Sequence, residues 1–491
     1  MRNSKQQPQE LLLRGVFVFE FRASNFLRIW FFEFLDFDAV DTPSYRYHHQ
    51  AMSSASNPSR LIIVGAGPAG LMAGIAAARA GAKVQVCEQL DRPGAKLSAA
   101  GGGRGNLTIR LSPAELAEAF GRQGRFILPA VEAMGPRELC EFLGELGIRT
   151  ASPDGLHVYP ASNHAAQVTA ALVRQAGRLG VELHFRTAVQ ALAIEGGHLR
   201  GVRTTAGALE ADGVILACGG RSYADLGGTG GGYALARQAG HTLIQPVPGL
   251  VPLVTAEKWP TTLAGVSVPD AAIRIDLSRQ RVPISRGDLL FTHRGVSGPA
   301  VLNISGRVAR LLEGGAPVPI ALDFAGGAGP RPWAARLDEW RISAGGVGLR
   351  GLLAHHLPRA LVDALCERAG VPTGCRAAEL SRPVRQALLA GLSAAPLSIP
   401  RTEGFERAMV TCGGVSLKEV DPRTLCSRLV WGLAFAGELL DLDGPTGGYN
   451  LQWAFASGHL AGTRWSFRKE KVSTEDTEEE HRERGEKRHK E

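Results

Sequence analysis

The sequence predicts an α/β protein in which a domain built on a parallel sheet is interrupted by an inserted segment. Three observations lead to this prediction. A strand, a glycine loop, a helix and a second strand follow one another at residues 61–88; short apolar segments broken by Pro and Gly begin at about residue 249; and a last buried strand and small-residue helix come at 432–462. With 491 residues, the chain is long enough for two or three domains and a large core.

The first element reads LIIVGAGPAGLMAGIAAARAGAKVQVCE. Its glycines have the spacing G-x-G-x-x-G, in which the first permits a tight turn, the second lets a pyrophosphate approach the backbone and the third lets helix and strand pack closely. The helix N-terminus offers free N–H groups to phosphates, and the final acid can accept hydrogen bonds from a ribose. The alternative is a glycine-rich turn in an unrelated α/β protein. We expect a dinucleotide at Gly65, Gly67, Ala69, Gly70, Glu88 and Gln89.

The second element, RPGAKLSAAGGGRGNLT, follows directly at residues 92–108. Three consecutive glycines can adopt backbone conformations closed to other residues, and their N–H groups can line a flat ring or a phosphate. Nearby cations favour a flavin, whose reduced ring is anionic. A plain flexible loop is the alternative. The expected contacts are Lys96, Gly101, Gly102, Gly103, Arg104 and Asn106.

The third element is GLAFAGELLDLDGPTGGYNLQWAFASGHLAG, at residues 432–462. We predict a buried strand at Phe435–Gly437 and a helix at Asn450–Gly462, whose glycine-bearing N-terminus suits a carbonyl or a phosphate. Asp441 is either a ligand for a ribityl hydroxyl or a cap, whereas Phe435, Leu451 and Trp453 are interpreted as core. The second and third elements together narrow the predicted ligand from any dinucleotide to FAD. The expected contacts are Gly437, Glu438, Asp441, Gly447, Gly448, Tyr449 and Asn450.

Helices are predicted within residues 112–150 and at 165–179, with strands at 181–185 and 189–194, a hairpin at 199–211 and a buried strand at 214–217. Further cofactor contacts are expected at Val189, Cys218, Gly219 and Gly220. The run GGTGGG at 227–232 follows no apolar strand, so we do not interpret it as a second dinucleotide unit. Any NAD(P)H would therefore bind transiently, without a Rossmann domain of its own.

The predicted organisation is a nucleotide domain at 60–248 and 413–466, interrupted by an inserted domain at 249–412. The insert has a β part at about 249–330 and 395–412 and a helical part at about 331–394. Its expected strands are the apolar segments 250–254, 271–277, 282–284 and 320–324.

The formal net charge of +8 comes from the body of the chain, because residues 1–51 are balanced and residues 468–491 carry one excess negative charge. A basic body is compatible with an anionic partner such as RNA or a phosphorylated cofactor, but an Arg-rich composition alone is the favoured explanation, and no RNA-binding signature is visible. The seven cysteines form no C-x-x-C, which argues against zinc, and no other metal is expected. A chain with no disulfide framework and no long apolar run is expected to be cytoplasmic, without a membrane span.

The two ends differ in composition from the body. The aromatic stretch 16–37 is interrupted by charges, which argues against a signal peptide. We hypothesise that Met52 is the natural start and that residues 1–59 are a non-native or disordered extension; a membrane-surface or partner-binding segment is the alternative. Residues 467–491, almost all charged or polar, are expected to be disordered or a solvated helix.

Taken together, these segments resemble the BaiN-like (YhiN-like) family of FAD-dependent oxidoreductases over about residues 60–466. The motifs that carry the resemblance are GAGPAGLMA, GAKLSAAGGGRGNLT, VYPASNHAAQV, CGGRSYADLGGTGGGYALARQAGH, GDLLFTHRGVSGPAVLNIS and GELLDLDGPTGGYNLQWAFASG. The resemblance implies a Rossmann-like FAD-binding domain interrupted by a β-barrel-like and helical domain. The chain departs from the family at Gly105, where relatives usually have Cys, and near His164, where they usually have Lys.

The resemblance further implies reduction of an activated C=C bond with NAD(P)H, on an enone-like small molecule or on ribosomal RNA uridine. A non-catalytic flavin-binding protein is a third alternative. Such a reduction needs a proton donor, for which Tyr223, His293 and Tyr449 are candidates by residue type, each with a structural role as the alternative. Arg104 is a candidate for stabilising the flavin or a developing enolate.

Overall fold

The computed structural model describes residues 58–277 and 284–465. The hypothesised extension before Met52 and the charged tail at 467–491 lie outside the described residues, as do Val282 and Pro283 of the strand expected at 282–284. The described residues form one compact unit.

The nucleotide domain is built on a five-stranded parallel sheet with the order β20-β10-β1-β2-β6. Its strands β1, β10 and β20 are continuous apolar runs that are buried almost throughout, as strands covered on both faces must be. In open parallel sheets ligands bind outside the carboxyl ends of the strands, so the central β1 places the glycine loop at the binding edge. The bounds are β1 Arg60–Val64, β2 Lys83–Cys87, β6 Glu182–His184, β10 Gly213–Leu216 and β20 Leu433–Phe435.

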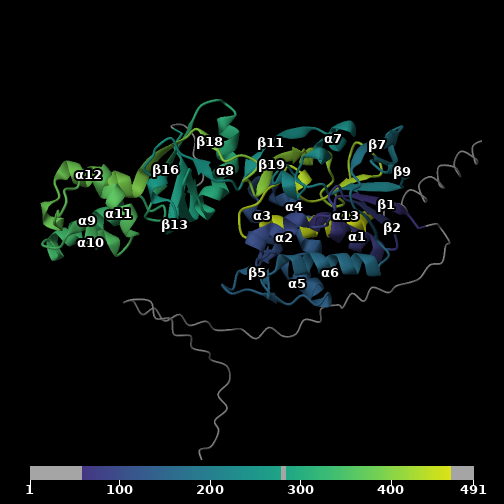
Figure 1. Ribbon diagram of the computed structural model, residues 1–491, viewed down its shortest axis with the longest axis horizontal. Helices are drawn as coiled ribbons and strands as arrows, with labels where there is room; N and C mark the ends of the chain where they lie inside the picture. The colour runs from purple at the N-terminus through teal and green to yellow at the C-terminus, as the bar shows by residue number, and fades with distance from the viewer. Residues whose placement is uncertain (1–57, 278–283, 466–491) are drawn as a thin grey trace, which may run out of the picture. The chain divides into compact units, whose positions relative to one another are not determined.

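Helices α1 (Pro68–Arg79) and α13 (Tyr449–Trp465) pack against each other although nearly four hundred residues separate them in sequence. Figure 1 shows the yellow α13 beside the purple α1. A Cβ atom would lie 2.2 Å from a backbone oxygen of α1 at Gly458 and 2.3 Å from another at Gly462. These glycines therefore allow the backbones of the two helices to approach each other. The end of the chain therefore completes the domain that the first motif begins.

The helices predicted within residues 112–150 and at 165–179 and the strands predicted at 181–185, 189–194 and 214–217 are confirmed. The strand expected at Phe435–Gly437 is wrong: β20 ends at Phe435, and Gly437, with φ +73°, begins a short 3-10 turn. Helices occur at α2 (Ala95–Ala99), α3 (Pro113–Ala119), α4 (Gly124–Ala133), α5 (Pro136–Glu145), α6 (Ala165–Arg178) and α7 (Gly231–Gln238). The expected hairpin belongs to an antiparallel meander of β7 (Val189–Glu195), β8 (His198–Thr204) and β9 (Gly207–Glu210). A small sheet is formed by β3 (Thr108–Ile109), β4 (Thr150–Ala151) and β5 (His157–Pro160).

The insert contains a seven-stranded antiparallel sheet with the order β17-β16-β13-β14-β15-β12-β18. The two edge strands are consecutive in the chain, with Pro400 alone between them. Because one residue cannot span an open sheet of seven strands, the sheet must curl until its edges meet, which gives the β-barrel-like form expected. The bounds are β12 Leu253–Val254, β13 Ser267–Ile275, β14 Ser285–Thr292, β15 Gly295–Ser297, β16 Val318–Asp323, β17 Ala395–Ile399 and β18 Arg401–Thr402.

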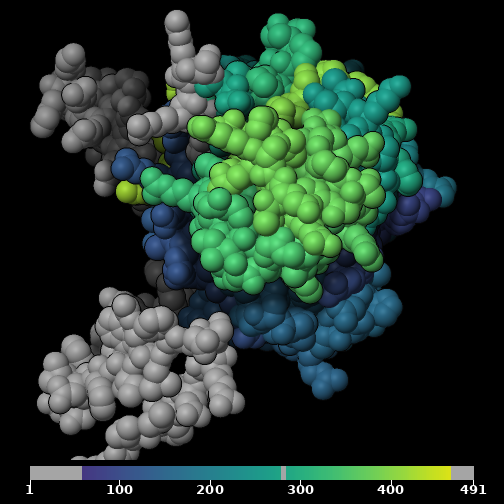
Figure 2. Space-filling model, turned by 90° about the vertical axis from the view of Figure 1, so that its left-hand side faces the viewer, coloured from purple at the N-terminus to yellow at the C-terminus, as the bar shows by residue number. Residues whose placement is uncertain are grey.

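The helical part of the insert comprises α9 (Arg331–Ser343), α10 (Leu349–Ala354), α11 (Arg359–Arg368) and α12 (Arg382–Ala394), whose green surface faces the viewer in Figure 2. It shares a hydrophobic core with the curled sheet and with α8 (Pro299–Leu312). The core of the nucleotide domain includes no residue between 240 and 414. The two domains therefore have separate cores.

Two antiparallel strands, β11 (Leu243–Gly249) and β19 (Val410–Val415), connect the domains. The predicted boundaries at 248/249 and 412/413 fall within this paired ribbon. Figure 1 shows α8 beside β11 and β19, and α8 packs against β11.

Candidate functional site

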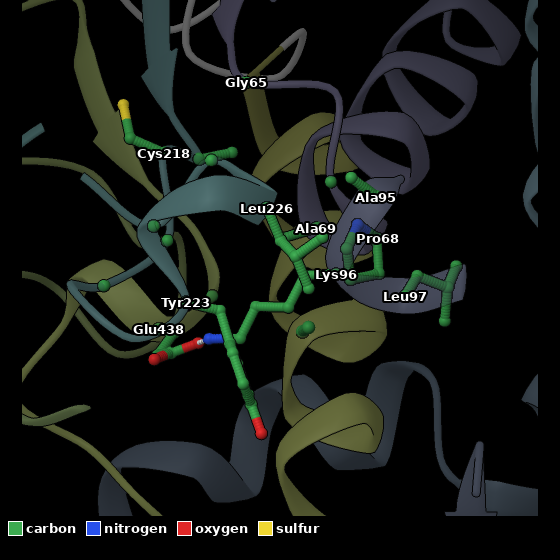
Figure 3. Close-up of a pocket in the computed structure, with 18 of the residues that line it drawn as sticks. Gly65, Pro68, Ala69, Ala95, Lys96, Leu97, Cys218, Tyr223, Leu226 and Glu438 are labelled. Atoms are coloured by element: carbon green, nitrogen blue, oxygen red, sulfur yellow. Dashed lines mark hydrogen bonds and ion pairs between the residues drawn. The ribbon is translucent and has the colours of Figure 1, made fainter. Parts of the chain in front are cut away.

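A cavity of about 580 Å³ lies at the carboxyl ends of the parallel strands. The three glycine-rich segments predicted from the sequence form its wall, together with the turn after β10 (Figure 3). The predicted cofactor residues in this wall are Gly65, Gly67, Ala69, Glu88, Gln89, Lys96, Gly101, Gly102, Asn106, Val189, Cys218, Gly219, Gly220, Gly437, Glu438, Gly447, Gly448 and Asn450.

The glycines of the first loop differ in what surrounds them. Gly65 has φ +103°, and a Cβ atom there would lie 2.6 Å from the carbonyl oxygen of Ala217. A Cβ atom at Gly70 would lie 1.8 Å from the oxygen of Gly65, whereas one at Gly67 would meet nothing within 4 Å. The first and third glycines therefore allow close packing, and the second leaves open space in the cavity wall, as the spacing predicts.

Glu88 closes this loop from the end of β2. Its Oε2 accepts a hydrogen bond from the Ala66 N–H at 2.7 Å, and its Oε1 accepts one from the Leu90 N–H at 2.9 Å. The side chain is buried yet lines the cavity. Each carboxylate oxygen has a second lone pair, so Glu88 can hold the loop in place and still accept a hydrogen bond from a ligand hydroxyl.

Lys96 reaches across the cavity to Glu438, 342 residues away in sequence (Figure 3). Its ammonium donates to Glu438 Oε2 at 2.6 Å and to Ser222 Oγ at 2.6 Å. Glu438 Oε1 also accepts from the Ser222 hydroxyl at 3.2 Å and from the Thr411 N–H at 2.9 Å. Lys96 and Glu438 are 29% and 20% exposed, so this network links four segments of the wall in a partly desolvated setting.

The second glycine loop leaves one polar atom without a partner. Gly101 and Gly102 adopt the left-handed conformation, with φ of +59° and +68°. Asn106 Oδ1 is buried and has no hydrogen-bond partner among the described residues. A Cβ atom at Gly448 would lie 2.9 Å from this oxygen, so the glycine allows the start of α13 to approach Asn106 closely. Because an unpaired buried acceptor costs about 1–3 kcal/mol, a donor from a ligand would be favoured here.

The N-terminus of α13 is held by Asn450. Its Oδ1 accepts from the Gly444 N–H at 2.8 Å, and its Nδ2 donates to the carbonyl oxygens of Gly444 and Pro445. The first helical hydrogen bond runs from the Gln452 N–H to the Gly448 oxygen. The amides before Gln452 are those that a helix leaves without internal partners, and Gly447, Gly448 and Asn450 place them in the cavity wall.

Five predicted cofactor residues do not line the cavity: Gly70, Gly103, Arg104, Asp441 and Tyr449. Asp441, considered as a ligand for a ribityl hydroxyl, lies outside this wall, and its carboxylate is 3.7 Å from Arg310 in the insert. The Arg104 guanidinium lies over the ring of Tyr159 at 4.7 Å. Gly105 is buried with φ +78°, and a Cβ atom there would lie 2.9 Å from Ala165 Cβ.

Of the three proton-donor candidates, Tyr223 alone lies in the cavity wall (Figure 3). It adopts a left-handed conformation with φ +55° after the turn that follows β10. His293 is exposed in the turn between β14 and β15, outside this wall. The Tyr449 ring packs edge-on against Phe120 with 6.3 Å between ring centres, and burial raises the pKa of Tyr449.

Sequence reasoning missed several residues of the wall. The GGTGGG run contributes to it, and Gln89 Nε2 donates to the Gly227 oxygen at 2.8 Å. Trp453 was interpreted as core only; it is buried, but it also lines the cavity and donates its indole N–H to the Gly437 oxygen at 3.1 Å. For the GGTGGG run, the signal in the sequence was the presence of five glycines in six residues.

Cys218 lines the cavity, but its thiol is not poised for nucleophilic chemistry. Burial, followed by the nearby Glu88 carboxylate, raises the pKa of Cys218 to about 12. In the part of the chain that the structure describes, no group of three or more His, Cys, Asp or Glu side chains is placed to hold a metal ion. Among the helices at 58–277 and 284–465, none combines the length and apolar character of a membrane span.

The fold and the glycine-lined cavity define a Rossmann-type nucleotide-binding protein. The family model described as HI0933-like protein Rossmann domain matches residues 59–464, and the chain belongs to this family. The chain is 36% identical over 410 residues to a 3-dehydro-bile acid delta(4,6)-reductase of Clostridium scindens, covering 82% of this chain and 98% of the relative.

It is also 30% identical over 411 residues to a ribosomal RNA dihydrouridine synthase of Escherichia coli, covering 81% of this chain and 95% of that protein. Among solved structures, a 3-ketosteroid delta1-dehydrogenase from Sterolibacterium denitrificans is similar with a TM-score of 0.47 and 14% identity, covering 84% of this chain and 100% of the other.

Proposed function

We propose that this protein is an FAD-dependent oxidoreductase that reduces an activated C=C bond with hydride taken from NAD(P)H. The observation that carries the proposal is the cavity in which three glycine-rich segments and two helix N-termini meet. Family membership and the relative named as a reductase support an oxidoreductase that uses a flavin.

The residues present fit FAD. The cavity volume lies within the range of cofactor pockets, about 300–1,000 Å³. The open space at Gly67, next to the N-terminus of α1, suits a pyrophosphate, and Glu88 suits the ribose hydroxyls. The unpaired Asn106 oxygen suits a ring N–H, and the amides at the start of α13 suit ring carbonyls.

When bound, a flavin supplies hydride transfer between donor and acceptor. The chain's own part is to place and stabilise charge. The N-terminus of α13 favours negative charge nearby, and Lys96 adds a cation whose carboxylate partner fixes its position. Tyr223 is the proposed proton donor to the substrate, because it is the one candidate of the three in the cavity wall.

The first experiment is to purify the protein, release its cofactor and identify FAD by chromatography, then compare the rates at which NADH and NADPH bleach the flavin absorption. We expect stoichiometric FAD and rapid bleaching by one of the two nucleotides. A colourless protein that gains no flavin absorption on addition of FAD would contradict the proposal. FAD that neither nucleotide reduces would favour a non-catalytic flavin-binding protein.

Reduction of uridine in ribosomal RNA is the second candidate. It is supported by the relative named as a ribosomal RNA dihydrouridine synthase and by the positive charge of the chain. Binding through phosphates should weaken steeply as salt increases. The tests are the salt dependence of binding to ribosomal RNA fragments and the dihydrouridine content of ribosomal RNA in a deletion strain. An unchanged content would exclude this candidate.

A further inference from the structure

A second cavity, of about 560 Å³, lies between α8 of the insert and the segment that precedes α13. Leu250 and Pro445 belong to the walls of both cavities, so the second cavity adjoins the first at these residues. Leu250 follows the connecting strand β11, and Pro445 leads into the glycines at the start of α13. A molecule in the second cavity would therefore lie next to the cofactor cavity.

Two arginines of α8 give this cavity a positive wall. Arg307 and Arg310 are three residues apart, which places them on neighbouring positions of one helix face. Arg310 lies 3.7 Å from the Asp441 carboxylate, and it donates to the Gln245 oxygen at 3.4 Å. Arg307 makes no hydrogen bond or ion pair with any described residue. Its charge is therefore available to a ligand.

The acid in the wall does not cancel this charge. Asp443 accepts a hydrogen bond from the Cys412 thiol at 3.1 Å, and burial raises the pKa of Asp443. Burial favours the neutral carboxyl, whereas the thiol hydrogen bond favours its charged form; on balance the pKa of Asp443 is raised, which reduces the repulsion on an anionic ligand. The Oδ1 of Asn303 accepts a hydrogen bond from the Thr446 N–H at 2.9 Å. The remaining wall is largely apolar, with Ala119, Leu250, Leu302, Leu311 and Pro445.

We propose that the second cavity binds an amphipathic organic anion, with its anionic group on Arg307 and its apolar body against the leucines and Pro445. This inference rests on the proposed function, because the anion is then the molecule that exchanges hydride at the cofactor cavity. The anionic group has two sources: the carboxylate of an unsaturated acid that is reduced, or a phosphate of the nucleotide that donates hydride. In both cases the cavity selects for charge as well as for shape.

The test measures ligand binding without relying on turnover. Calorimetry on the purified full chain would compare an unsaturated 3-oxo bile acid, its methyl ester and NADPH as ligands. The variants are Arg307→Gln, Arg307→Lys, which retains the charge, and Arg359→Gln, which removes an exposed arginine of α11 outside both cavities. FAD content and thermal stability are measured for each, and neither is expected to change.

For a carboxylate ligand, we expect Arg307→Gln to weaken binding of the acid at least tenfold, to leave the ester unchanged and to be partly rescued by Arg307→Lys. For a phosphate ligand, the tenfold loss falls on NADPH instead. Equal affinities in the parent, Arg307→Gln and Arg359→Gln for all three ligands would overturn the proposal. Absence of FAD from the protein would contradict the proposed function, whereas these binding measurements do not depend on turnover.

Discussion

The two cavities of this protein are built from different parts of the chain. The wall of the first consists largely of glycines, main-chain amides and the starts of two helices, with Lys96 and Glu438 joined across it. The second presents side chains of one helix, Arg307 and Arg310, and an adjoining acid. Main-chain groups are positioned by the fold, so most binding groups of the first cavity are not removed by a single side-chain substitution. The second can acquire another specificity through single substitutions.

The largest effect should follow from adding a methyl group at Gly70, where α1 packs closely against the first glycine loop of the cavity. Gly70→Ala places a methyl group 1.8 Å from the Gly65 oxygen, and such overpacking costs about 1–3 kcal/mol or more. The matched control is Gly74→Ala in the same helix, where the nearest atom would be 3.5 Å away. Chemical denaturation should show a marked loss for the first variant and little change for the second. Equal denaturation midpoints for the two variants would mean that the close contact between Gly70 and Gly65 does not stabilise the wall of the first cavity.

The next effect concerns the ion pair between Lys96 and Glu438, which joins distant segments across the first cavity. Lys96→Met leaves the Glu438 carboxylate with its hydrogen bonds to Ser222 and the Thr411 N–H, but without its cation. We expect a loss of about 1–2 kcal/mol in the free energy of unfolding. Glu210→Gln, which removes the exposed pair with Arg60, should cost less than about 1 kcal/mol. Similar losses in the free energy of unfolding for the two variants would show that the Lys96–Glu438 pair stabilises the protein no more than an exposed ion pair does.

A third variant separates binding from stability in the same loop. Gly67→Val introduces a side chain into open space on the cavity side, at a backbone conformation that other residues adopt. The free energy of unfolding of the cofactor-free protein should hardly change, while FAD affinity falls at least tenfold, or about 1.4 kcal/mol. Fluorescence titration of the cofactor-free protein with FAD measures this. Unaltered affinity would show that no ligand approaches Gly67.

The smallest effect comes from His241, which lies outside both cavities at the base of the connecting ribbon. Burial lowers its pKa below 6.5, despite the Glu419 carboxylate 3.3 Å away. The folded protein therefore binds fewer protons than the unfolded chain, so this contribution is intact above pH 6.5 and lost as the pH falls below it. His241→Gln should flatten the pH dependence of the unfolding free energy in that range. If His241→Gln kept the pH dependence of the parent protein, His241 would not be the group responsible for it.

The sequence predicted where the first cavity forms better than it predicted which side chains line it. Glycine spacing constrains the backbone locally, so Gly65, Gly67 and Gly70 could each be given a role before the structure was known. Asp441 and Glu438 illustrate the limit: two acids in one loop differ in orientation by the turn between them, and the partner of Asp441, Arg310, lies in another domain. The second cavity was not predicted, because it forms only where α8 meets a segment more than a hundred residues away.

The discontinuity of the nucleotide domain has a consequence for the order in which the protein is made. The insert is contiguous in sequence, and all strands of its curled sheet are available once Thr402 has left the ribosome. The parallel sheet still lacks β20 and the helix α13 at that moment. Because domains fold as units during synthesis, the nascent chain carries a folded insert beside an unfinished nucleotide domain, with β10 and α1 uncovered. Until α13 is made, those apolar surfaces lack the segments that cover them in the finished protein.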